Sequence, residues 1–134
     1  MIKKRMIKSA AIALMASALF AMPTMAEYYG FSFNVEVAED AEDIAYSGNA
    51  RKDNYNDYAS VDCQKSNIYS KDDFRLCVVK QYGDDDEVSE QIRATANTGT
   101  YYLDYIEDVY YDNMYRLRGR TYNWYVSVSG EWEP

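Results

Sequence analysis

The chain has no histidine among its 134 residues. Histidine is the commonest general base, and the Ser-His-Asp and Cys-His arrangements both depend on it, so most hydrolase mechanisms are excluded. A pair of carboxylates could still act on a glycosidic bond, but with 22 acidic residues no spacing singles out one pair. No phosphate-binding glycine loop and no nucleophile motif occur either. The sequence therefore predicts a protein that is not an enzyme.

Cysteine is almost absent, since Cys63 and Cys77 are the only two. Two thiols without a histidine cannot complete a typical zinc shell. Acidic clusters at 39–43, 53–57 and 84–87 offer oxygen ligands for Ca²⁺, but none has the ligand spacing and glycine of an EF-hand. We predict solvated turns at these clusters and neither a metal nor a cofactor, with weak calcium binding as the alternative.

Acidic residues are missing from positions 1–26, which begin with four cations and then run uncharged from Ala10 to Met22. These are the basic and apolar regions of a signal peptide. The apolar run is shorter than the roughly 20 residues that cross a bilayer as a helix. Small residues at Thr24 and Ala26 predict cleavage before Glu27. An uncleaved anchor helix is the alternative.

Cleavage would leave one domain, residues 27–134, with ten basic and 22 acidic residues and a formal charge of −12. Such a charge disfavours nucleic acid and anionic membranes and favours cationic partners. Glu27 stands where a lipoprotein would have its lipidated cysteine, so no membrane anchor is expected after cleavage. We predict a secreted extracellular protein, or a periplasmic one in a host with two membranes, whose partner is an unidentified protein or glycan.

Leucine is also scarce after residue 26, with three residues against 15 tyrosines. Aromatic and β-branched residues favour strands. So acidic a chain could be disordered, but its aromatic rings can bury large areas, which favours a folded domain.

Alternating apolar and polar residues predict the strands. The alternation is clearest at 29–37, where one face carries the apolar residues Tyr29, Phe31, Phe33, Val35 and Val37. Residues 100–115 fit a helix or a strand, and the density of tyrosine favours a strand. At 124–132 Trp124, Val126, Val128 and Trp132 share one face, which predicts a core strand, and Gly130 interrupts the alternation and indicates a bulge. Other β-type runs lie at 44–50, 58–64, 74–80 and 88–95. Seven or eight short strands predict an all-β fold, a small antiparallel β-sandwich or barrel, preceded by the signal peptide helix.

The two cysteines each lie within a β-type run, with the polar stretch 65–73 between the runs. An even number of cysteines in an exported chain predicts a disulfide, here between Cys63 and Cys77 on adjacent strands. Closing a loop of about 15 residues would stabilise the domain by about 3 kcal/mol. The alternative is two reduced, buried cysteines.

Two further sets of side chains are candidates for ligand contact. Arg116, Arg118 and Arg120 alternate, so on a strand they share one face and could contact an anion, although pairing with acids on a neighbouring strand is commoner. Exposed tyrosines could stack on sugar rings, as in carbohydrate-binding modules. Adjacent tyrosines on a strand point to opposite faces, so about half are expected in the core. The candidates for stacking are Tyr102, Tyr111 and Tyr125.

Short motifs at both ends carry a resemblance. They are Phe31-Ser32-Phe33 after the signal peptide, Tyr-Arg-Leu-Arg-Gly at 115–119 and Tyr-Val-Ser-Val-Ser-Gly-Glu-Trp at 125–132. Together they resemble small exported proteins of Gram-positive bacteria near the lactococcin-type bacteriocin family. The resemblance implies a β-sandwich that acts on a competitor's envelope. We expect a secreted, non-enzymatic, bacteriocin-like interaction protein, with a carbohydrate-binding module as the alternative.

Overall fold

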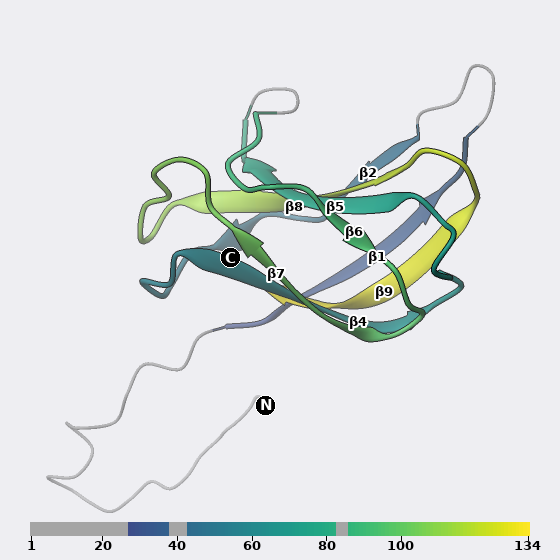
Figure 1. Cartoon of the computed structure of the whole chain (residues 1–134). Helices are drawn as coiled ribbons and strands as arrows, with labels where there is room; N and C mark the ends of the chain where they lie inside the picture. The colour runs from purple at the N-terminus through teal and green to yellow at the C-terminus, as the bar shows by residue number, and fades with distance from the viewer. Residues whose placement is uncertain (1–26, 38–42, 83–85) are drawn as a thin grey trace, which may run out of the picture.

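The structure is a computed structural model that describes residues 27–37, 43–82 and 86–134 (Figure 1). Within these ranges the chain forms nine strands in two stacked sheets, and every strand pairing is antiparallel. The predicted small all-β sandwich is therefore confirmed, with one strand more than the upper estimate. The predicted signal peptide lies outside the described residues. Nowhere in the described ranges is there a helix that could span a membrane.

The two sheets draw on strands from all parts of the chain. The first sheet has the order β1, β9, β4, β7, with β1 at Tyr29–Val35, β9 at Val126–Glu133, β4 at Tyr58–Ser66 and β7 at Gly99–Asp104. The second has the order β2, β8, β5, β6, with β2 at Ile44–Tyr46, β8 at Met114–Thr121, β5 at Phe74–Lys80 and β6 at Ile92–Ala94. The short β3, Ala50–Arg51, also pairs with β8.

The core lies between the sheets and is built by alternation. Phe31, Phe33 and Val35 are buried, as predicted for the first strand, whereas Val37 is 51% exposed because β1 ends at Val35. Trp132 of β9 is fully buried, but the prediction that Trp124 shares its core face is wrong, because Trp124 is 62% exposed. The strand begins only at Val126, and Trp124 lies in the preceding turn, where its carbonyl accepts a hydrogen bond from the Thr121 hydroxyl. The alternation of side chains therefore placed the start of this strand two residues too early.

Residues 100–115 are strand at their two ends but not in between. β7 ends at Asp104, and the chain then loops until β8 begins at Met114. The Tyr110 backbone N–H donates to the Tyr115 hydroxyl at 3.0 Å, and Asp112 has a positive φ of 73°. A left-handed residue interrupts both helix and strand, so β8 starts only after Asp112.

The bulge predicted at Gly130 of β9 lies on the neighbouring strand β4, opposite Gly130. The pairing of β4 with β9 shifts register between Cys63 and Lys65, where Cys63 faces Gly130. A Cβ at position 130 would overlap the Asp62 carbonyl oxygen and lie 3.1 Å from the Gln64 nitrogen. The close approach of two backbones requires glycine here.

The predicted disulfide is wrong. Cys63 lies on β4 of the first sheet and Cys77 on β5 of the second, so residues 67–73 cross between sheets instead of turning a hairpin. Cys63 belongs to the core, whereas Cys77 points to the outer side of its sheet, where its thiol donates to the Ser89 carbonyl at 3.3 Å. Both cysteines are free and buried. Burial raises the pKa of the Cys63 thiol to about 12.

Candidate functional site

A groove crosses the outer face of the first sheet. Tyr58, Ser60 and Asp62 alternate along β4, so all three point away from the core. Ser60 lies between Tyr102 of β7 and Glu133 of β9 in the strand register. Three separate strands therefore place a tyrosine, a serine and a carboxylate in one row.

The next row of the same face brings two acids together. Asp62 lies opposite Glu131 on one side and Thr100 on the other. The Thr100 hydroxyl donates to Asp62 Oδ1 at 3.3 Å, and Gln64 Nε2 donates to Asp62 Oδ2 at 3.2 Å. Like charges directly opposite each other on neighbouring strands are destabilising. The fold thus holds two carboxylates side by side against their repulsion.

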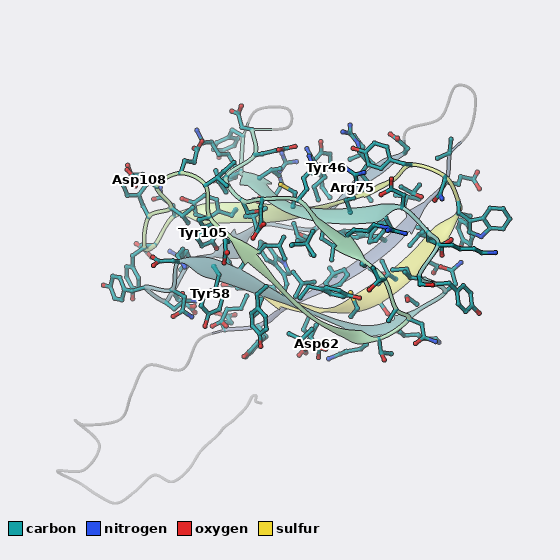
Figure 2. The ribbon with its side chains drawn as sticks, in the orientation of Figure 1. Tyr46, Tyr58, Asp62, Arg75, Tyr105 and Asp108 are labelled. Atoms are coloured by element: carbon teal, nitrogen blue, oxygen red, sulfur yellow. The ribbon has the colours of Figure 1, made fainter. Side chains whose placement is uncertain are left out.

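Exposed tyrosine rings border these carboxylates. Tyr28 is 58% exposed, Tyr102 60% and Tyr58 38%. The rings of Tyr58 and Tyr102 meet edge to face, with centroids 5.5 Å apart. Figure 2 shows Tyr58 and Asp62 on the same sheet. The groove has a volume of about 450 Å³ and is lined by Tyr28, Asn56, Tyr58, Ser60, Asp62, Thr100, Tyr102, Glu131 and Glu133.

The groove is strongly negative, because three carboxylates and no lysine or arginine line it. Glu133 is only 8% exposed, and burial raises the pKa of its carboxyl group. The charge of Glu133 in turn is the main cause that raises the pKa of the Tyr28 hydroxyl. A cation in the groove would relieve this accumulated negative charge.

A second hollow meets the groove at Asn56, which lines both. It has a volume of about 490 Å³ and includes Tyr55 and Tyr111, whose rings stack with centroids 4.8 Å apart and planes within 9°. Tyr105 lies in its wall at the same end of the sandwich (Figure 2). The groove and the second hollow together therefore form a longer surface lined with tyrosine rings than the groove alone.

Lys52 closes the base of this second hollow. It is 2% exposed, its ammonium donates to Asn54 Oδ1 at 2.8 Å and to the Pro134 carbonyl at 3.3 Å, and it lies 5.0 Å from the centre of the Tyr105 ring. Burial lowers the pKa of Lys52 and raises that of Tyr105. The lysine thereby ties β3 to the C-terminal segment.

The three tyrosines proposed from the sequence do not come together. Tyr102 lines the groove and Tyr111 the second hollow, but Tyr125 lies in the turn before β9, where its hydroxyl donates to Asn34 Oδ1 at 3.3 Å. Sequence reasoning missed Tyr58 and Tyr28. The alternation of Tyr58 with Ser60 and Asp62 was a usable signal for an outward ring, whereas Tyr28 precedes its strand and has no such pattern.

Arg116, Arg118 and Arg120 share the outer face of β8, as their alternation predicted. Arg118 is 1% exposed and binds Glu87 with Nη2 to Oε2 at 2.6 Å. Arg116 lies 4.3 Å from the centre of the Tyr46 ring, and its Nε donates to the Lys80 carbonyl. Arg118 therefore pairs with an acid, the alternative that the sequence offered to anion contact.

The acidic clusters are only partly described. Residues 39–42 and 84–85 lie outside the described ranges. At 53–57, Asn54 Oδ1 accepts hydrogen bonds from Lys52 and from the Asn56 backbone. In the described part of the chain, no group of three or more cysteine, aspartate or glutamate side chains is arranged to hold a metal ion. Comparison with known protein families, curated proteins and solved structures found no match to the chain.

Two carboxylates near Lys52, the buried Glu133 and the half-buried Asp53, predict a pH dependence of stability. Burial raises the pKa of Glu133 and of Asp53 in the folded state. The folded protein then takes up protons more readily than the unfolded chain, so stability rises as pH falls from neutrality through these raised pKa values. Asp73 opposes this trend only at lower pH, because the hydrogen bond from Arg75 lowers its pKa.

We therefore expect the purified protein to melt at a higher temperature at pH 5 than at pH 7. Glu133→Gln should melt higher than the wild type at pH 7 and gain less on acidification, because it removes the buried charge. The control is Glu36→Gln, because Glu36 is an exposed residue directly after the end of β1. Thermal melting followed by circular dichroism measures all three proteins. Equal gains in wild type and Glu133→Gln would contradict the assignment to Glu133.

Proposed function

We propose that the chain is a secreted, non-enzymatic binding protein and that the groove on the first sheet takes a glycan. The observation that supports this most directly is the placement of Tyr28, Tyr58 and Tyr102 beside Asp62, Glu131 and Glu133 on one sheet face. Tyrosine rings offer apolar faces to the C–H groups of a sugar, and carboxylates accept hydrogen bonds from its hydroxyl groups.

The charge of the groove favours a glycan that carries free amino groups. Asp62 and Glu131 lie directly opposite each other, and an ammonium group between them would form charge-assisted hydrogen bonds to both. A sugar without a positive charge would leave the repulsion in place. The ligand class is therefore an oligosaccharide of amino sugars, and the second hollow beyond Asn56 favours an oligomer over a single sugar.

Calorimetry with a glucosamine oligomer and with its N-acetylated counterpart tests this function. We expect the charged oligomer to bind more tightly, and Tyr102→Ala to weaken its binding about tenfold, equivalent to about 1.4 kcal/mol. Asp62→Asn should weaken the charged oligomer more than the acetylated one, because it removes a charge and preserves the side-chain shape. Tyr69→Ala, a substitution of a ring 63% exposed in the crossover between the sheets, is the matched control.

The absence of binding by either oligomer would contradict the proposal, as would equal affinities for wild type and Tyr102→Ala. Binding that is lost equally in Tyr69→Ala would show that the groove is not the site. Bacteriocin-like killing stays a prediction, for which inhibition of related bacteria by the purified protein is the test.

A further inference from the structure

Three arginines form a row across the outer face of the second sheet. Arg75 of β5 lies opposite Arg120 of β8 on one side and opposite Arg93 of β6 on the other. Directly opposed residues of neighbouring strands point to the same face. Figure 2 shows Arg75 on the sheet opposite to Tyr58 and Asp62. The row is therefore separate from the glycan groove.

Of these three arginines, Arg75 is paired with a carboxylate, and that carboxylate, Asp73, also feels the charge of Arg93. Arg75 binds Asp73 through Nε at 2.8 Å and Nη2 at 3.1 Å. Arg93 donates to the backbone carbonyls of Asp72 and Ser70, which carry no net charge. Opposed like charges on adjacent strands destabilise a sheet, so the sequence maintains this row at a cost in stability.

One hydrogen-bond donor of Arg120 is unsatisfied. Its Nε is buried and has no hydrogen-bond partner among the described residues, while its Nη1 lies 3.5 Å from the Tyr122 hydroxyl. The Tyr122 ring is near two guanidinium groups, with its centre 4.6 Å from Arg75 and 5.7 Å from Arg120. This ring contact holds the two guanidinium groups beside each other. An unsatisfied buried donor of this kind is costly to the fold.

The same face carries two further arginines, Arg116 and Arg118, of which Arg118 is paired with Glu87. Five of the six arginines in residues 27–134 lie on the outer side of β5, β6 and β8, although the same residues carry a net charge of −12. Guanidinium groups bind phosphate and sulfate oxygens through paired, nearly parallel hydrogen bonds. We propose that Arg75, Arg93 and Arg120 form a binding site for a tetrahedral oxyanion, the phosphate or sulfate group of an extracellular ligand.

Calorimetry with inorganic pyrophosphate and with inorganic sulfate, at an ionic strength held constant with sodium chloride, tests this site on the full protein. We expect binding that Arg120→Gln weakens at least about fivefold and that Arg75→Gln also weakens. Arg51→Gln is the matched control, because Arg51 is an exposed arginine on β3 whose partner is Asp112. Competition by polyphosphate or by dextran sulfate then distinguishes a phosphate source from a sulfate source, and either result supports the site.

A second measurement covers variants that fail to fold. In the wild-type protein, pyrophosphate should protect Arg75 and Arg120 from modification by phenylglyoxal and leave Arg51 reactive. Equal weakening by Arg51→Gln, or the absence of both binding and protection, would overturn the proposal. Self-association of the protein is a further possible outcome. If a salt-sensitive self-association were abolished both by Arg120→Gln and by Asp62→Asn, and pyrophosphate had no effect on it, the arginine face would bind the acidic face of a second copy. That result would also overturn the proposal. Loss of glycan binding in Tyr102→Ala leaves these outcomes unchanged, so the two sites are tested independently.

Discussion

Gly130→Ala is expected to destabilise the protein by about 3 kcal/mol, a large part of the 5–15 kcal/mol that typically holds a domain folded. The added methyl group would overlap the Asp62 carbonyl oxygen of the neighbouring strand. Backbone cannot move aside as a flexible side chain can, so β4 and β9 must separate at the bulge. Because β9 is paired on both sides, with β1 and β4, the disturbance reaches the middle of the first sheet.

Urea unfolding followed by tyrosine and tryptophan fluorescence measures this loss. Gly48→Ala is the matched control, because a Cβ at position 48 meets nothing within 4 Å. The control should change the free energy of unfolding by less than about 0.5 kcal/mol. If Gly130→Ala unfolded at the same urea concentration as Gly48→Ala, the close backbone approach at the bulge would be refuted.

Glu87→Gln is expected to destabilise the protein by about 2 kcal/mol. Arg118 is almost fully buried, and Glu87 binds its guanidinium group with a carboxylate oxygen 2.6 Å away. Removing one partner of a buried ion pair typically costs 3–5 kcal/mol. We expect less here because the Glu87 side chain is 32% exposed, so water can screen part of the charge that remains.

The double variant Glu87→Gln, Arg118→Met should recover most of the lost stability, because an apolar side chain of similar length needs no counter-charge. Glu107→Gln is the control, since Glu107 pairs with Lys80 at 3.4 Å and both side chains are about half exposed. An exposed pair of this kind contributes less than about 1 kcal/mol. A double variant no more stable than Glu87→Gln alone would show that Arg118 contributes through packing and not through its charge.

The alternation of buried and exposed residues within single strands could be predicted from the sequence. Alternation of side chains is a local property of extended backbone. It therefore identified the buried Phe31, Phe33 and Val35, and it placed Arg116, Arg118 and Arg120 on one face. It failed for Trp124, because alternation does not show where a strand begins.

The pairing of strands was not readable, and both candidate sites depend on it. Cys63 and Cys77 were each placed on the right strand, but the disulfide prediction was wrong because β4 and β5 belong to different sheets.

The sequence by itself determined the all-β class, the face on which the side chains of the regular strands lie and a bulge near position 130, because these follow from local backbone geometry. Why residue 130 must be glycine was decided by the tertiary structure, since the carbonyl oxygen that a Cβ would overlap belongs to β4. The tertiary structure decided which faces meet. It brought Asp62 against Glu131 and Arg75 between Arg93 and Arg120, since cross-strand neighbours far apart in the chain are fixed by burying a shared core and not by any local pattern.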